Sequence, residues 1–150
     1  MNRIQRSAMV PYTAAEMYQL VTDIDEYQSF LPWCGGSKVL ESSRNQVTAE
    51  VYIDFKGLKK RFVTVNQNTP PQKIEMNLKE GPFQSLHGEW VFRNLNPSAS
   101  QVKLDIQFEF AGIIMEKLMA PVFSAITGTM VESFTARAEQ VYGKRKLHFS

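Results

Sequence analysis

A sustained alternation of apolar and polar residues between Ser37 and Phe110 constrains the fold of this chain more than any other feature. Apolar side chains occupy every second position in four segments, residues 47–55, 74–78, 86–92 and 102–110. A period of two is typical of β-strands with one face in a core and the other in water. Glycine and proline residues separate these segments, at Gly57, Pro70, Pro71, Gly81 and Pro82. The pattern therefore predicts an antiparallel meander.

The last part of the chain has the period of a helix instead. Between Gly112 and Gly143 apolar residues recur at a helical spacing, at Ile114, Leu118, Val122, Ile126, Met130, Phe134 and Ala138. Such a helix is about 45 Å long, more than a small domain needs to close its core. Pro121 removes a backbone donor, so a kink or a restart of the helix is expected there. A long helix after a series of strands is expected to cover a curved sheet.

The N-terminal segment adds one strand and two short helices. Residues 3–10 have strand character and end at Pro11. The sequence from Thr13 to Glu16 is a capping box, and Asp25 is a candidate cap for a second short helix. The order predicts an α+β helix-grip fold, in which a curved antiparallel sheet of about six or seven strands wraps around the C-terminal helix. Residues 1–150 are expected to form a single domain.

Charge and cysteine content exclude several classes of protein. The formal net charge of +2 gives no argument for a DNA partner. Cys34 is the single cysteine, so an internal disulfide is excluded and a reducing compartment is expected. We expect no run long enough to span a membrane and no apolar signal core at the N-terminus. The expected location is the cytoplasm, either free or peripheral at the inner membrane.

No familiar catalytic or metal-binding constellation is present in the sequence. Cys34, His87 and His148 are far apart and lack the spacing of metal ligands, so no metal is expected. Glu50, on the polar side of its strand, is expected to belong to a solvated face rather than to an acid–base pair. Inward positions are nearly all hydrocarbon, which favours binding over catalysis.

Small residues on the predicted apolar faces leave room for a ligand. They are Gly88, Ala111, Ala125 and Gly128. Two interpretations remain open, a ligand cavity between sheet and helix or simply close packing of the helix on the sheet. If a tunnel passes Gly128, the substitution Gly128→Leu is expected to abolish lipid binding.

Three segments resemble a known family. They are residues 6–12 (RSAMVPY), 27–34 (YQSFLPWC) and 81–92 (GPFQSLHGEWVF). Together they resemble the coenzyme Q-binding protein family of the START-like superfamily, which also contains polyketide cyclases. The resemblance covers essentially the whole chain. It implies an apolar tunnel that holds ubiquinone or a similar isoprenoid as a bound ligand, with no other cofactor required. The bacterial branch includes ribosome association toxins of the RatA type, which implies the large ribosomal subunit as an alternative partner.

The residues expected to form the tunnel and its mouth follow from this resemblance and from the helix pattern. They are Phe30, Leu31, Trp33, Phe83, Trp90, Phe108, Met115, Met119, Phe123, Ile126 and Met130. Phe30, Leu31, Trp33 and Phe83 adjoin turns, where they either pack locally or form an apolar rim that touches a membrane. The indole of Trp90 is the preferred polar contact for a quinone carbonyl, and Arg6 could face inward toward a headgroup or Glu16.

A basic hairpin, formed by Lys56, Lys59, Lys60 and Arg61, is the candidate surface for ribosomal RNA or an anionic membrane. A second basic group, Lys144 to Lys146, follows the long helix. A solvated surface is the alternative for both groups. Three hypotheses therefore stand: a non-enzymatic quinone-binding protein that supports respiratory electron transport, a ribosome-binding toxin that blocks subunit joining, and a cyclase-like enzyme.

Overall fold

A computed structural model describes residues 2–147, which form one seven-stranded antiparallel sheet with three α-helices and a 3-10 turn. The elements in chain order are β1 (Asn2–Val10), α1 (Ala14–Thr22), η1 (Ile24–Glu26), α2 (Tyr27–Phe30), β2 (Cys34–Ser42), β3 (Gln46–Phe55), β4 (Leu58–Thr69), β5 (Lys73–Glu80), β6 (Phe83–Asn96), β7 (Ala99–Phe110) and α3 (Ile113–Tyr142). The predicted α+β architecture is confirmed.

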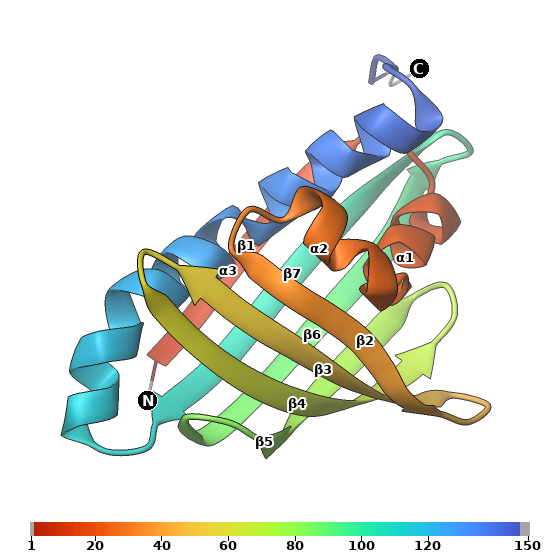
Figure 1. Cartoon of the computed structure of the whole chain (residues 1–150). Coiled ribbons are helices and arrows are strands. Elements are labelled where there is room, and N and C mark those ends of the chain that lie inside the picture. The colour runs from red at the N-terminus through yellow and green to blue at the C-terminus, as the bar shows by residue number, and fades with distance from the viewer. Residues whose placement is uncertain (1, 148–150) are drawn as a thin grey trace.

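The sheet is a meander in which each strand from β2 to β7 pairs with its neighbour in sequence. The strand order is β1-β7-β6-β5-β4-β3-β2, so β1 closes the β7 edge. Figure 1 shows the curved sheet with α3 running along its concave side. The β3–β4 turn has positive φ at Lys56 (51°) and Gly57 (82°), as the two central residues of a type I′ hairpin require. This turn pairs Phe55 with Leu58 and fixes the register of both strands.

The predicted capping box opens α1. The amide of Glu16 donates to Thr13 Oγ1 at 3.1 Å, and the amide of Thr13 donates to Glu16 Oε1 at 2.9 Å. The prediction that Asp25 caps a second helix is wrong. Glu26 precedes α2 without a side-chain cap, while the Asp25 carboxylate accepts the Val39 amide at 3.1 Å. Asp25 therefore ties η1 to the edge strand β2.

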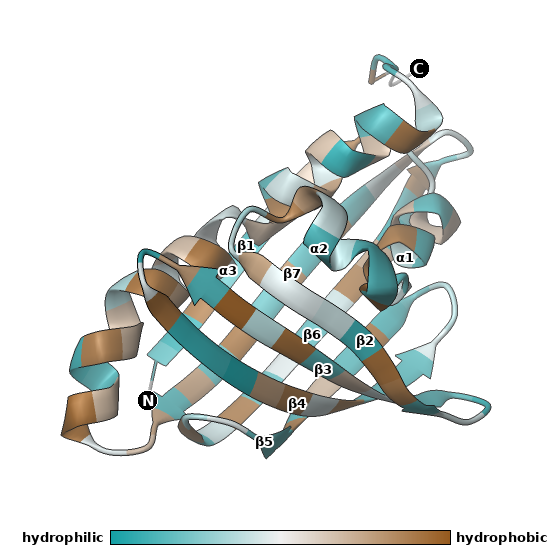
Figure 2. Cartoon of the chain, viewed as in Figure 1, coloured by the Kyte–Doolittle hydropathy of each residue, from teal (hydrophilic) through white to brown (hydrophobic). Residues whose placement is uncertain are grey.

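The inward face of α3 differs from the predicted one in its first half. Met119 and Phe123 are buried, whereas Ile114 and Leu118 are 75% and 53% exposed. Met119 and Phe123 also belong to the predicted inward residues. The main predicted stripe, Ile114 to Ala138, advances in steps of four residues, each about 40° beyond a full turn of a 3.6-residue helix. It therefore drifts around the helix, and its first members lie outside. In Figure 2 the first turns of α3 are largely brown, which marks hydrophobic residues.

Helix α3 continues through Pro121, and Figure 1 shows its axis bending in the N-terminal part, in agreement with the expected kink. The expectation that no run could span a membrane is wrong, because α3 is long and apolar enough to do so. Here, however, Phe134 and Ala138 are fully buried in the core of the fold. Only 28% of the apolar 18-residue window of α3 is buried in the fold, so most of that window is at least partly exposed.

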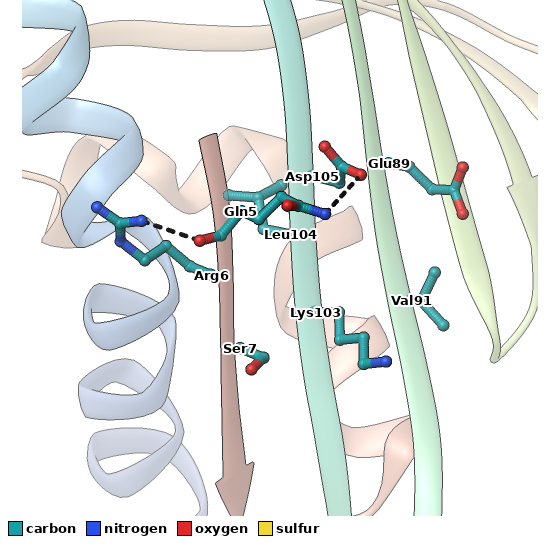
Figure 3. A pocket seen from close by; sticks show the side chains of 8 residues that line it. All are labelled: Gln5, Arg6, Ser7, Glu89, Val91, Lys103, Leu104 and Asp105. Carbon is teal, nitrogen blue, oxygen red and sulfur yellow. Dashed lines mark hydrogen bonds between the residues drawn. The ribbon is translucent and has the colours of Figure 1, made fainter. Parts of the chain in front are cut away.

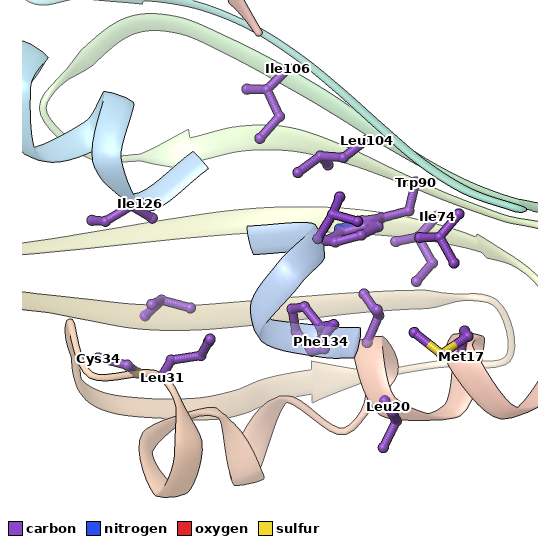
Figure 4. Close-up of a cluster of buried hydrophobic side chains, with 14 of the residues drawn as sticks. Met17, Leu20, Leu31, Cys34, Ile74, Trp90, Leu104, Ile106, Ile126 and Phe134 are labelled. Carbon is purple, nitrogen blue, oxygen red and sulfur yellow. The ribbon is translucent and has the colours of Figure 1, made fainter. Parts of the chain in front are cut away.

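Phe134 is the centre of the aromatic core beneath the C-terminal half of α3. Its ring lies 5.4 Å from the rings of Trp90 and Tyr27 and 5.3 Å from that of Phe30, all edge to face. Figure 4 shows Phe134 facing Trp90 across the space between α3 and the sheet. Met17 of α1, also fully buried, belongs to the same cluster.

The segment after α3 is held against α1. Arg145 donates two hydrogen bonds to the Glu16 carboxylate, at 2.8 and 3.0 Å. The hydroxyl of Tyr142 donates to the Glu16 carbonyl at 3.0 Å, and that of Tyr12 donates to the Gly143 carbonyl at 2.7 Å. Arg145 also lies over the Tyr12 ring. The N-terminal third and the end of α3 are therefore stabilised as one unit.

This contact predicts an acid-sensitive contribution to stability. The hydrogen bond from Arg145 lowers the pKa of Glu16 below its ordinary value of 4.5. The folded-state pKa is thus below the unfolded one, so the stabilisation is complete above about pH 5 and is lost as the pH falls through the folded pKa. Glu16→Gln is expected to reduce the acid-induced loss of unfolding free energy, measured by urea denaturation at pH 6 and 3.5. Glu132→Gln, an exposed carboxylate on α3, is the control, and equal losses in both variants would contradict the assignment.

Candidate functional site

A cavity lies between the inner face of the sheet and α3, and we call it the inner cavity. Its volume is about 80 Å³. The residues around it come from η1, α2, β3 to β7 and α3, with Trp33 from the α2–β2 connection: Ile24, Tyr27, Trp33, Ala49, Val51, Phe62, Thr64, Asn66, Met76, Leu86, Trp90, Ile106, Phe123, Ile126, Thr127 and Met130. The sheet therefore supplies one wall, and the middle of α3 supplies the other.

The inner cavity contains little that could perform acid–base chemistry. None of the described residues that surround it carries a charge, and Tyr27 is the titratable one. Burial raises the pKa of the Tyr27 hydroxyl, and this hydroxyl donates a hydrogen bond to the Val21 carbonyl. A neutral phenol committed to the backbone is poorly suited to remove a proton from a substrate.

Trp33 contributes an unusual polar atom to the lining. Its side chain is 5% exposed, and its Nε1 is buried without a hydrogen-bond partner among the described residues. Burying an indole N–H without an acceptor is unfavourable, so such a donor in a cavity is a candidate ligand contact. The sequence favoured Trp90 for this role. Trp90 does line the cavity, but Trp33 is the tryptophan whose donor is left unpaired.

The predicted tunnel residues divide into two groups. Trp33, Trp90, Phe123, Ile126 and Met130 surround the inner cavity. The others lie elsewhere, namely Phe30, Leu31, Phe83, Phe108, Met115 and Met119.

The second group fills space or packs locally instead of lining the inner cavity. Phe83, Phe108 and Phe123 form an aromatic cluster with ring separations of 4.7 to 6.4 Å. Phe30 lies half-buried beneath Arg137. The expectation of an exposed apolar rim is wrong for Leu31, Trp33 and Phe83, whose exposures are 2%, 5% and 5%. These side chains pack inward because the segments that contain Pro32 and Pro82 fold over the core.

One of the four small residues adjoins the inner cavity. A Cβ at Gly88 would lie 2.7 Å from Met76 Cε, so this glycine makes room for a methionine of the lining. Gly128 instead faces Arg6, whose Nη2 would be 3.7 Å from a Cβ there. Ala111 and Ala125 are exposed. The expectation that Gly128→Leu blocks the tunnel is therefore wrong, because Gly128 lies against the edge strand β1.

Arg6 is exposed rather than turned into the core, and Figure 3 shows it pointing toward α3 while it donates to the Gln5 carbonyl at 2.9 Å. The same figure shows a shallow hollow of about 460 Å³ on the outer face of β1, β7 and β6. Its Asp105 is paired with Arg3 at 2.7 Å, and its Glu89 lies 3.7 Å from Lys73. Open to solvent and internally paired, this hollow is an ordinary polar sheet face.

The four cationic residues of the basic hairpin differ in their exposure and in their acidic partners. Arg61 is engaged by Glu50 and by Glu80, the latter at 3.0 Å. Glu50 is only 5% exposed, so the expectation that it is solvated is wrong, since its cationic partners cover it. Lys56 and Lys59 are exposed and Lys60 is half-buried. Figure 1 shows this hairpin far from the C-terminal end that carries the second basic group, so the two do not form one surface.

No metal site is evident among residues 2–147, where no group of three or more His, Cys, Asp or Glu side chains comes together. His148 lies outside the described residues. Cys34 is buried, which raises the pKa of its thiol, and its Sγ lies 3.3 Å from the Gly36 carbonyl. A buried thiol of raised pKa is a structural group rather than a nucleophile.

The lining residues that sequence reasoning missed lie on η1, α2, α3 and β3 to β7. Thr64 and Asn66 are the notable ones, each 7% exposed and each part of the cavity wall. Val63 and Val65, the valines of the same strand, share the opposite face of β4. The available clue was the hairpin turn, which fixes the face of every residue on β4 once that of β3 is known.

Comparison with known proteins yields one family and two kinds of relative. A family model described as polyketide cyclase / dehydrase and lipid transport matches residues 10–135. The ribosome association toxin RatA of Pseudomonas aeruginosa is 44% identical over 140 residues, covering 93% of this chain and 97% of that protein. The mitochondrial coenzyme Q-binding protein COQ10 homolog B of Xenopus laevis is 26% identical over 145 residues, covering 94% of this chain and 59% of that protein. The Zhui aromatase/cyclase of a Streptomyces species superposes with a TM-score of 0.83 over 93% of this chain and 94% of the enzyme, at 15% identity. At that identity the likeness shows the fold alone.

Proposed function

The chain belongs to the polyketide cyclase / dehydrase and lipid transport family, and we propose that it binds ubiquinone or a related prenyl lipid in the inner cavity. The observation that carries this proposal is a cavity between the sheet and α3 whose described lining is uncharged and mostly hydrocarbon. Apolar walls with a few polar atoms are typical of sites for small hydrophobic ligands. The coenzyme Q-binding name of the Xenopus laevis relative supports the same ligand class.

The proposed ligand requires the inner cavity to expand. Its volume of about 80 Å³ is well below the roughly 300–1,000 Å³ of drug-sized ligand sites. Met76 and Met130 are half-buried members of the lining. Methionine side chains are unbranched and flexible, so they can move aside for an isoprenoid tail at little cost. We therefore expect the ligand to be gripped by side chains that repack around it.

The proposed activity is carriage rather than catalysis. A cyclase needs polar groups placed to activate an enol, and the cavity offers Tyr27, whose hydroxyl is already bound to the backbone. Carriage of a quinone would support respiratory electron transport from a cytoplasmic protein that visits the inner membrane. Ile113, Ile114 and Leu118 are 67%, 75% and 53% exposed and are the apolar contact we propose for such visits.

The direct test is to purify the chain from the organism that naturally produces it and to analyse an organic extract by mass spectrometry. A quinone or other prenyl lipid in near-stoichiometric amount is the expected result. A protein free of lipid that also fails to take up decylubiquinone in a titration would overturn the proposal.

A second candidate function is association with the large ribosomal subunit. It is favoured by 44% identity, over nearly the full length, to a protein named ribosome association toxin. Lys56 and Lys59 of the basic hairpin are exposed and have no acidic partner among the described residues. They are the contact we propose for ribosomal RNA phosphates, which lysine neutralises with release of counterions.

Charge reversal of the basic hairpin separates the two functions. The double variant Lys56→Glu/Lys59→Glu is expected to weaken co-sedimentation with ribosomal subunits by about tenfold or more, with a shallower dependence on salt. Its lipid content is expected to stay unchanged, because neither residue lines the inner cavity. Lys144→Glu, the same change at the far end of the molecule, is the control. Unaltered sedimentation of the double variant would exclude the hairpin as the contact.

A further inference from the structure

The inner face of β4 carries buried polar side chains at positions where a strand of this sheet would be expected to carry apolar ones. In the register of the β3–β4 hairpin, Thr64 lies opposite Ala49 and Asn66 opposite Val47, which places both on the concave side. Both are 7% exposed. The valines of β4, Val63 and Val65, occupy its other face. Thr64 and Asn66 thus lie on a buried face beside Phe62, while Val63 and Val65 lie on the outer one, and buried polar residues of this kind concentrate at functional sites.

These side chains form a row that we call the β4 polar row: Thr64, Asn66 and Asn68. The Thr64 hydroxyl donates to Asn66 Oδ1 at 2.8 Å. The amide Nδ2 of Asn66 donates to no described residue. Asn68 Oδ1 is buried and accepts no hydrogen bond from the described part of the chain. The row therefore offers a free donor at Asn66 and a free acceptor at Asn68.

The row lies between the inner cavity and a second cavity of about 170 Å³ beside η1 and β2. Four residues border both spaces: Ile24, Tyr27, Asn66 and Met76. Asn66 stands at this junction, and Asn68 borders the second cavity alone. None of the described residues around either space is charged. An apolar cavity thus adjoins a second uncharged cavity, whose lining includes the amides of Asn66 and Asn68.

We propose that the β4 polar row receives the uncharged, hydroxyl-bearing head of an amphipathic ligand whose apolar part occupies the inner cavity. This inference rests on the proposed lipid-binding function and specifies the head. A charged head would be buried without a counter-charge, which is strongly unfavourable. A hydroxyl can donate to Asn68 Oδ1 and accept from Asn66 Nδ2, so it satisfies both free groups.

The redox form of a quinone ligand follows from the same chemistry. A hydroquinone carries hydroxyls, whereas a quinone carries carbonyl oxygens that can only accept hydrogen bonds. A bound quinone would leave Asn68 Oδ1 buried without a donor, and an unpaired buried acceptor lowers affinity. The protein is therefore expected to bind the reduced form more tightly than the oxidised form.

The test is an anaerobic titration of the full chain with decylhydroquinone and with decylbenzoquinone, two probes that share one tail. Wild type is expected to bind the hydroquinone about tenfold more tightly, the value of one well-satisfied hydrogen bond. Asn68→Leu, close to Asn in volume, is expected to remove this preference while leaving the quinone affinity within about twofold. Asn66→Leu is expected to weaken both probes. The control is Asn77→Leu on the exposed side of β5, for which no change is expected.

The outcomes separate this inference from the function on which it rests. Equal affinity of wild type for the two probes, or a preference that survives in a folded Asn68→Leu variant, would overturn the inference and leave lipid binding intact. Binding of neither probe would overturn both. If Asn68→Leu does not fold, Asn66→Leu still tests the inference. Undiminished binding of both probes by the Asn66→Leu variant would contradict a ligand head bound at the β4 polar row.

Discussion

Phe134→Ala is expected to lower the free energy of unfolding by about 3–5 kcal/mol. The side chain is fully buried and meets the rings of Trp90, Tyr27 and Phe30 edge to face. Its loss removes apolar surface from the core and leaves a cavity that three rigid aromatic rings cannot fill. Because domains of this size are stable by only about 5–15 kcal/mol, the change is a large part of the total. Urea denaturation at neutral pH measures it.

The same helix supplies the control for this measurement. Val141→Ala removes apolar atoms from a side chain that is 49% exposed, so the expected change is within about 0.5 kcal/mol. Phe134→Leu keeps most of the buried volume and should fall between the two. A loss below about 1 kcal/mol for Phe134→Ala would contradict the central position of this ring in the core.

Ala49→Leu is expected to weaken binding of a prenyl ligand strongly while leaving the protein folded. Ala49 lies on the inner face of β3, is 3% exposed and borders the inner cavity. The added methyl groups would occupy space that a ligand tail needs, and a space of about 80 Å³ has little to spare. Affinity for decylubiquinone should fall at least about tenfold, which corresponds to about 1.4 kcal/mol. Titration of the variant against wild type measures the effect.

Ala125→Leu is the matched control, because it makes the same chemical change at an exposed position of α3 outside the cavity. Its ligand affinity should equal that of wild type. Thermal unfolding shows whether Ala49→Leu keeps the fold, since overfilling a packed core costs typically 1–3 kcal/mol. A folded Ala49→Leu variant with undiminished affinity would place the ligand somewhere other than the inner cavity.

The secondary structure of this protein could be predicted because each element is specified by residues close together in sequence. The alternation within residues 47–55 determines a strand wherever that segment folds against a core. The capping box of Thr13 and Glu16 satisfies the first amides of α1 with local partners. The order of strands and helices then limits the architecture to a sheet covered by a long helix. Resemblance to a known family added the expectation of a ligand between them.

The functional residues were harder to predict because the alternation of apolar and polar residues does not reveal which face of a strand points into the core. On β4 both faces carry apolar residues, and Val63 is 1% exposed on the outer one. The hairpin at Lys56 and Gly57 decides the matter by pairing Phe55 with Leu58, which turns Thr64 inward. A register shift by one residue would have reversed every side chain of the strand.

Local residue patterns specify the strands, the helices, their order and the capping of α1, because those features depend on neighbours within a few positions. The tertiary structure alone decided that Gly128 faces Arg6, that Trp33 has a buried unpaired N–H, and that Asn66 borders two cavities. Each of these depends on the rotation of α3 or the register of β4 relative to distant strands. Such relations are fixed by packing across the core, and no local pattern encodes them.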